Sequence, residues 1–164
     1  VGSGKGGVGK STLAANLAIA LSRTGMKVGL VDADIYGPSQ PKLLATEGLK
    51  PMVEGDKLVP LVSRHGVKVL SMGHIVAPGK ALAWRGPMTG KALSQLVDAD
   101  WGDTDLLLVD EPTASLDELS LRYILQALSV LKTQSALVVV SHDPALSDLA
   151  NQQLTLSEVV DAAN

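Results

Sequence analysis

The sequence contains no cysteine and no phenylalanine, and its 164 residues include only two tryptophans and two tyrosines. The absence of cysteine excludes disulfides, thiolate-ligated metals and cysteine-held iron–sulfur clusters within this chain. Because aromatic side chains are so few, the core must consist of Leu, Val, Ile and Ala, which is typical of buried parallel strands packed between helices. Hydrophobic residues make up 46% of the chain, enough for the core of one compact domain.

The chain also lacks an excess of positive charge and any long apolar run. Its net charge of −3 gives no electrostatic reason to expect binding to nucleic acid. No apolar segment approaches the length that spans a membrane, and no basic-plus-apolar signal peptide is present. The sequence therefore predicts a cytoplasmic protein with no nucleic-acid partner and no direct membrane insertion.

A glycine-rich stretch near the beginning of the chain is the strongest functional motif. Residues 4–11, GKGGVGKS, match the phosphate-binding pattern G-x-x-x-x-G-K-[ST] and open an Ala- and Leu-rich helix expected over 11–23. The glycines let the backbone turn its N–H groups toward phosphate oxygens, and the helix N-terminus adds positive potential. We expect Lys10 to bridge the β- and γ-phosphates of ATP and Ser11 to ligate Mg²⁺. The predicted nucleotide-binding residues are Gly4, Lys5, Gly6, Gly7, Val8, Gly9, Lys10, Ser11 and Thr12.

Only Val1 and Gly2 precede this stretch, although a phosphate-binding loop normally follows a strand. Two residues cannot form a strand, so either the first strand is truncated or the fold tolerates a short stub there. We favour a fragment that lacks its first strand.

Strand-like and helix-like segments alternate along the rest of the chain. The expected strands are 27–34, 67–72, 105–110, 135–141 and 153–159, and the expected helices are 11–23, 87–97, a helix capped by Ser115 and Glu118, and 144–150. Residues 35–66 are rich in Gly and Pro and are expected to form loops with short elements. This alternation predicts a single α/β domain over residues 1–164, a P-loop NTPase fold whose mostly parallel sheet is sandwiched by helices.

Acidic residues end two of the expected strands. Asp32 and Asp34 follow one apolar run, and Asp110 and Glu111 follow another. Ligands of open α/β sheets bind at the carboxyl ends of the strands, where an Asp can orient water or hold Mg²⁺. Capping and solvation of a strand end is the alternative role for Asp32 and Asp34. Two adjacent acids at the end of a buried strand are costly unless they are used.

Several stretches in the first two-thirds of the chain read SGKGGVGKST, VDADIYGPSQP, GVKVLSMG, WRGPM and DWGDTDLLLVD, in that order. Together they resemble the Mrp-type iron–sulfur cluster carrier ATPases of the MinD/ParA superfamily, over residues 1 to about 110. The resemblance implies that Lys5 reaches across a homodimer to the other subunit's nucleotide, and that Asp34 positions the attacking water. It also implies that Asp32 lies near the Mg²⁺ and that Asp110 is the Walker B acid. Iron–sulfur apoproteins are the implied partners, although the family's Cys-x-x-Cys pair does not occur in this chain.

Residues 111–164 follow another pattern, which begins with EPTASLD and continues with an amphipathic segment, ALVVVSHDPAL and LTLSE. It is similar to the C-terminal part of an ABC-transporter ATPase domain. That resemblance implies that Asp110 holds Mg²⁺ through water, Glu111 is the general base and His142 reaches the γ-phosphate. A solvated strand-end histidine is the alternative for His142. The Leu-Ser-Gly-Gly-Gln segment of ABC ATPases does not occur in the chain.

Three hypotheses for the function follow. The first is a Mrp-like P-loop ATPase that binds ATP and Mg²⁺ and hydrolyses ATP slowly. The second is an ABC-type ATPase subunit that powers transport, and the third is a nucleotide-binding chimera or fragment without turnover. The predicted catalytic residues are Lys5, Lys10, Asp34, Glu111 and His142, and the predicted metal-binding residues are Ser11, Asp32 and Asp110.

Overall fold

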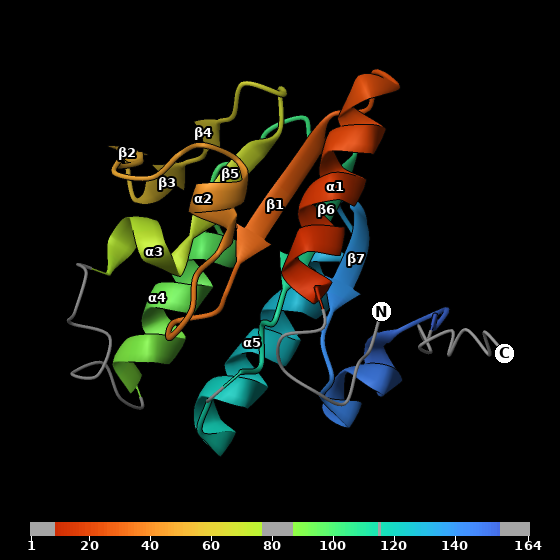
Figure 1. The fold of residues 1–164 in the computed structure, drawn as a ribbon. Helices are drawn as coiled ribbons and strands as arrows, with labels where there is room; N and C mark the ends of the chain where they lie inside the picture. Colours follow the sequence, from red (N-terminus) through yellow and green to blue (C-terminus); the bar gives the residue numbers. More distant parts are fainter. Residues whose placement is uncertain (1–8, 77–86, 115, 155–164) are drawn as a thin grey trace, which may run out of the picture.

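A five-stranded sheet with the strand order β4-β5-β1-β6-β7 organises the molecule, and β2 and β3 form a separate antiparallel pair (Figure 1). The computed structural model describes residues 9–76, 87–114 and 116–154. Within them the elements in chain order are α1 (Lys10–Arg23), β1 (Val28–Asp32), α2 (Gln40–Leu43), β2 (Met52–Glu54), β3 (Lys57–Val59), β4 (Leu61–Val62), β5 (Lys68–Ser71), α3 (Met72–Ile75), α4 (Pro87–Val97), β6 (Leu106–Asp110), α5 (Glu118–Leu131), β7 (Ala136–Val140) and the 3₁₀ helix η2 (Pro144–Leu149).

The sheet is mostly parallel, as the alternation of segments predicts. β5, β1, β6 and β7 pair in parallel, and β4 alone runs antiparallel, against β5. The strands expected over 27–34, 67–72, 105–110 and 135–141 are confirmed as β1, β5, β6 and β7, with shorter bounds. The α/β fold class is therefore confirmed.

β1 and β6 form the centre of the sheet, and all five residues of each strand are buried. Their side chains alternate between the two faces, as in any strand. Leu30 and Leu108 pack in one apolar cluster, whereas Val31 and Val109 pack in the other. Strands covered on both faces read as continuous apolar runs, which is why the sequence pattern locates them so well.

The helix α1 covers one face of the sheet, and α4 and α5 pack side by side on the other (Figure 1). α1 buries its alanines Ala14, Ala15 and Ala18. α4 and α5 approach each other closely at Gly90, where an added Cβ would lie 2.5 Å from the Ser120 hydroxyl oxygen. A glycine is needed there because any side chain would push the two helices apart.

The start of α5 differs from the capping box expected at Ser115 and Glu118. The N-cap is Asp117, whose carboxylate accepts a hydrogen bond from the backbone N–H of Ser120 at 2.7 Å. Glu118 is the first residue of the helix, so the predicted box is wrong, and Ser115 itself lies outside the described residues. An Asp at this position satisfies a free N–H and also interacts well with the positive end of the helix.

The remaining segments agree with the pattern where they are described. Residues 35–66 form short elements, and the helix expected over 144–150 is η2. The strand expected over 153–159 and the truncated strand expected before the glycine loop lie mainly outside the described residues. Among the described helices, none has the length and apolar character that crossing a bilayer requires.

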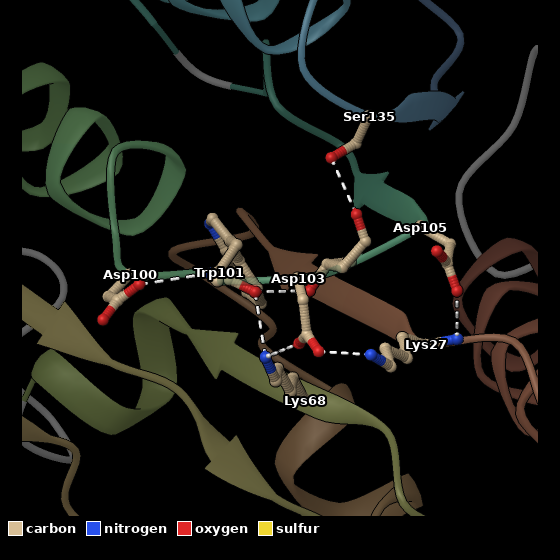
Figure 2. A network of polar contacts seen from close by, with 9 residues as sticks. Lys27, Lys68, Asp100, Trp101, Asp103, Asp105 and Ser135 are labelled. Atoms are coloured by element: carbon tan, nitrogen blue, oxygen red, sulfur yellow. Dashed lines mark hydrogen bonds and ion pairs between the residues drawn. The ribbon is translucent and has the colours of Figure 1, made fainter.

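A network of charged residues joins the amino ends of the strands (Figure 2). The backbone N–H of Lys27 donates to Asp105 at 2.8 Å, and its ammonium group pairs with Asp103. The ammonium group of Lys68 donates to the Trp101 carbonyl at 2.9 Å and lies 3.4 Å from Asp103. The hydrogen bond from Lys27, reinforced by Lys68, holds the pKa of Asp103 below its ordinary value of 3.8.

We expect Asp103→Asn to lower the melting temperature slightly at neutral pH, because the ion pairs are exposed and exposed pairs contribute little. A carboxyl whose pKa is lowered by folding stabilises above its unfolded pKa, and this stabilisation is lost as the pH falls through the folded pKa. The difference between the two proteins should therefore vanish well below pH 3.8. Thermal unfolding at both pH values measures it, and an equal difference at both would contradict the prediction.

Candidate functional site

Three polar side chains form a row across the carboxyl ends of neighbouring strands. The register pairs Ser71 of β5 with Asp32 of β1, and Asp32 with Asp110 of β6. Leu30 and Leu108, two residues before the acids, pack against α1. Because side chains alternate along a strand, the row lies on the same face, toward α1.

Asp32 is completely buried and accepts three hydrogen bonds. Its Oδ2 accepts from the backbone N–H of Gln40 and from the Ser71 hydroxyl, both at 3.0 Å, and its Oδ1 accepts from the backbone N–H of Asp34 at 3.3 Å. Burial raises the pKa of Asp32 to about 7, although these hydrogen bonds act to lower it. The negative charge of Asp110 adds to the increase. The site therefore holds a carboxyl group that is partly protonated near neutral pH when no cation is bound.

Asp110 is 1% exposed and lies against the first turn of α1. Its Oδ2 accepts from the side-chain amide of Gln40 at 3.0 Å, and the Ser11 side chain lies near enough to the carboxyl group to act against the rise of its pKa. Burial raises the pKa of Asp110 as well. Within the described residues, Oδ1 is buried without a hydrogen-bond partner. A buried carboxylate oxygen without a donor indicates a place for a cation or an ordered water.

Lys10, Glu111 and His142 form a second polar cluster beside the row. Lys10 Nζ lies 3.2 Å from Glu111 Oε1, and the two side chains are only 10% and 11% exposed. His142 Nδ1 lies 3.2 Å from Glu111 Oε2. The first turn of α1, the end of β6 and the end of β7 thus meet at one carboxylate.

The backbone of Glu111 adopts a left-handed conformation, with φ of 51°. Its N–H still donates to the Val140 carbonyl at 2.8 Å, so the pairing of β6 with β7 continues one residue beyond the strand. A left-handed conformation in a residue other than glycine costs about 1 kcal/mol or more, and such residues gather at functional sites. This conformation coincides with the meeting of Glu111 with Lys10 and His142.

Asp34 forms the turn that follows β1. Its Oδ1 accepts from the backbone N–H groups of Tyr36 at 3.0 Å and Gly37 at 3.1 Å. Its charge contributes to the raised pKa of Asp110, so the carboxylate lies near the row. The capping role considered for Asp34 is therefore present, and its role in positioning water stays a prediction.

The start of α1 is suited to an anion. Gly9 is the N-cap, in the left-handed region with φ of 85°, and the first turn holds neither a side-chain cap nor an acidic residue. Helix N-termini without such partners bind phosphate through backbone N–H groups and the helix dipole. Thr12 is exposed in this turn. Gly4, Lys5, Gly6, Gly7 and Val8 lie outside the described residues, so the roles expected of them stay predictions.

The structure also brings in two residues that sequence reasoning missed, Gln40 and Ser71. Both hydrogen-bond to the acids of the row. Neither belongs to a residue type that signals catalysis or metal binding on its own. The only local signal is Pro41, which follows Gln40 in the first turn of α2. Proline is common at helix starts, so this signal indicates a helix start rather than a site.

The oxygen groups of the row are of the kind that Mg²⁺ prefers. In the described part of the chain, no three His, Cys, Asp or Glu side chains gather as a metal site. A P-loop site does not need such a group, because Mg²⁺ takes most of its ligands from phosphate and water and only one or two from the protein. The Ser11 hydroxyl and the unpaired Oδ1 of Asp110 fit that requirement.

Comparison with known proteins shows the family. A family model described as ParA, NUBPL iron-transfer P-loop NTPase, matches residues 1–162. The chain belongs to the NUBPL iron-transfer P-loop NTPase family. This membership confirms the resemblance to iron–sulfur cluster carrier ATPases over the first part of the chain.

Curated relatives of this NUBPL-family chain are longer than the chain itself. The iron-sulfur cluster carrier protein of Bacillus subtilis is 51% identical over 118 residues, which cover 71% of this chain and 33% of the relative. The iron-sulfur cluster carrier protein of Escherichia coli K12 is 42% identical over 164 residues, which cover 98% of this chain and 42% of the relative. The chain spans between a third and about half of the length of the curated relatives it matches.

A solved structure of a nucleotide-binding protein from Archaeoglobus fulgidus, in complex with ADP, has a similar fold. The TM-score is 0.58 at 28% identity, and the match covers 85% of this chain and 63% of the other. The P-loop NTPase fold of the NUBPL-family chain is therefore confirmed. The family model and the Escherichia coli relative both continue past Asp110, so the comparisons give no support to a separate ABC-transporter ATPase origin of residues 111–164.

We expect the free energy of unfolding of the metal-free, nucleotide-free protein to decrease between about pH 4 and pH 7. Folded Asp32 keeps its proton up to about pH 7, whereas the unfolded chain loses it near 3.8. The folded state therefore binds more protons in this window, and stability falls as the pH rises, by on the order of 1 kcal/mol per pH unit. Asp32→Asn should remove this part of the decrease in urea unfolding curves with a chelator present. A variant with the same pH dependence as the wild type would show that Asp32 is not the source.

Proposed function

We propose that the chain binds ATP with Mg²⁺ and hydrolyses it slowly, as the nucleotide-handling part of an iron–sulfur cluster carrier. The observation that supports this most is the position of Asp110. The carboxyl group of Asp110 is buried near Ser11, in the first turn of the helix that follows the phosphate-binding motif, and one of its oxygens has no hydrogen-bond partner among the described residues. The names of the relatives support the carrier role, and the ADP complex of the structural neighbour supports nucleotide binding.

The phosphates would lie at the start of α1. Backbone N–H groups of the loop and the positive end of the helix bind the β- and γ-phosphates. Lys10 would neutralise part of their charge, as the motif implies. Lys10 Nζ lies 3.2 Å from Glu111 Oε1, so a γ-phosphate would compete with Glu111 for this lysine.

The Ser11 hydroxyl and Asp110 would hold Mg²⁺, with Asp32 nearby. The bound cation supplies charge neutralisation of the phosphate oxygens. It would also offset the repulsion between the neighbouring carboxylates of Asp32 and Asp110, which helps to raise the pKa of Asp32 in its absence.

Two carboxylates are candidates for positioning the attacking water. Asp34 is the candidate that the family resemblance implies, and it lies close enough to the row to affect the pKa of Asp110. Glu111 is nearly buried and contacts both Lys10 and His142. Lys5 of a second copy would add positive charge at the γ-phosphate, in a homodimer formed through the nucleotide face.

The cargo and partners follow from the carrier role. Because the chain has no cysteine, the ligands of an iron–sulfur cluster would come from outside this chain. Iron–sulfur apoproteins are the proposed recipients of the cluster. A cytoplasmic location remains an expectation from composition.

The contact between Glu111 and His142 favours a second candidate, an ABC-type use of the same site. In that chemistry Glu111 polarises the attacking water and His142 reaches the γ-phosphate. The two side chains lie 3.2 Å apart, so both could act on one nucleotide. The missing Leu-Ser-Gly-Gly-Gln segment counts against it, since an ABC dimer completes its nucleotide site with that segment.

Nucleotide binding is tested first, with fluorescent ADP and ATP analogues on the 164-residue chain. We expect binding in the micromolar range and a loss of at least about tenfold in Lys10→Ala, because the motif places the ammonium group of Lys10 beside the phosphates. Lys132→Ala, at an exposed lysine that donates to the Leu149 carbonyl, serves as a matched control and should bind as the wild type does. Failure of the wild-type chain to bind either nucleotide would overturn the proposed function.

Steady-state release of phosphate then separates the candidates for catalysis. If Glu111 orients the water, Glu111→Gln lowers kcat by about 10²-fold or more and Asp34→Ala does not. If Asp34 orients it, the reverse result is expected, and this is the outcome that the family membership favours. Thermal unfolding of each variant controls for loss of the ion pair with Lys10. If the wild type binds nucleotide but releases no phosphate, the hydrolytic part of the proposal is wrong and the chain is a nucleotide-binding module without turnover.

A further inference from the structure

Gln40 is a fully buried polar residue to which none of the roles above is assigned. Its exposed fraction is 0%, although glutamine side chains usually lie at the surface. It begins the four-residue helix α2, after the turn that follows β1. A buried amide is tolerated when its hydrogen-bonding groups are used, so its contacts indicate its purpose.

The contacts of Gln40 reach both acids of the row and the first turn of α1. Its Nε2 donates to Asp110 Oδ2 at 3.0 Å and to the Ser11 carbonyl oxygen at 2.8 Å, which uses both of the hydrogens on that nitrogen. Its backbone N–H donates to Asp32 Oδ2 at 3.0 Å. One residue therefore links β1, β6 and α1 at the point where their polar groups meet.

The orientation of the amide is fixed by its partners. Turning the amide by 180° would place Oε1 against the Asp110 carboxylate and the Ser11 carbonyl oxygen. An ionised carboxylate and a carbonyl oxygen have no hydrogen to donate, so Oε1 would lose both contacts. The Gln40 side chain thus holds the Asp110 carboxylate in one position relative to Ser11.

Two buried acceptors remain without a donor in the described residues, and both belong to this pair. They are Gln40 Oε1 and Asp110 Oδ1. Unpaired buried acceptors require a donor or a cation nearby, and a single water molecule can donate to two of them. Because Mg²⁺ in P-loop sites keeps several of its waters, these two oxygens suit the surroundings of a hydrated cation.

We propose that Gln40 is a positioning residue of the Mg²⁺ site, which fixes the Asp110 carboxylate against the first turn of α1. The inference rests on the proposed binding of ATP with Mg²⁺. Without the amide, Asp110 Oδ2 loses its donor from α2 and the carboxylate is free to rotate away from Ser11. Partners that hold a metal ligand in place typically contribute about 10- to 100-fold in metal affinity.

The test uses Gln40→Met, which keeps the length, the apolar stem and the backbone N–H to Asp32 and removes only the amide. Binding of N-methylanthraniloyl-ADP is titrated with the 164-residue chain, first in EDTA and then at increasing Mg²⁺. We expect the Mg²⁺ concentration for half-maximal enhancement of binding to rise by about tenfold or more. ADP affinity in EDTA should stay within about threefold of the wild type.

Thr104→Val is the matched control, since it removes a buried hydroxyl that donates to Trp101 at the opposite end of the sheet. It should leave the Mg²⁺ dependence unchanged even if it lowers the melting temperature. Gln40→Asn keeps the buried amide but is one methylene too short to reach both acceptors, and it should shift the Mg²⁺ dependence in the same direction. If Gln40→Met does not fold, the Mg²⁺ dependence of Gln40→Asn alone tests the proposal.

The proposal is overturned if every Gln40 variant that folds reaches half-maximal enhancement of ADP binding at the same Mg²⁺ concentration as the wild type. It is also overturned if ADP affinity in EDTA falls by the same factor as affinity in Mg²⁺, because Gln40 would then support the loop rather than the cation. A wild-type chain that binds no ADP would instead refute the proposed function, and the two failures are thus told apart.

Discussion

The register of two parallel strands forces two acids side by side, and the rest of the site depends on this constraint. Asp32 and Asp110 occupy equivalent positions on β1 and β6, both on the face covered by α1. Neighbouring strands lie about 4.8 Å apart, so two buried carboxylates at paired positions repel each other. Neutral donors from Ser71 and Gln40 reduce this cost, and the pKa of Asp32 is still raised to about 7. A divalent cation is the natural complement of such a pair.

The first turn of α1 serves two clusters at once because consecutive helix residues point in different directions. Ser11 contacts the row through Asp110, and Lys10 contacts Glu111. In the proposed function the cation would join the first cluster and the phosphates would draw Lys10 from the second. Binding of ATP would therefore change the partners of Glu111 without any movement of the sheet, and His142 would remain as its neighbour.

The fold could largely be predicted from the sequence, because strands buried on both faces appear as short apolar runs that end in acid. Lys10, Ser11 and Asp110 could also be placed, since a local motif and the carboxyl ends of parallel strands specify them. Gln40 could not, because its role depends on a register between segments 70 residues apart, which no local pattern contains. The pattern also misplaces the cap of α5, because Ser115 and Asp117 are both residue types that cap helices and the helix begins after Asp117.

The charged network at the amino ends of the strands has a consequence for protein engineering. Five residues of β1, at about 3.3 Å each, separate Lys27 from the row of acids by roughly 16 Å. In the network both ammonium groups pair with Asp103, and Asp105 accepts from the backbone N–H of Lys27. Two positive and two negative charges therefore lie close together, and their net field at that distance is small. Surface charge can therefore be redesigned at one end of the sheet to tune solubility or thermal tolerance with little effect on titration and cation binding at the other end, as long as positive and negative charges there stay matched.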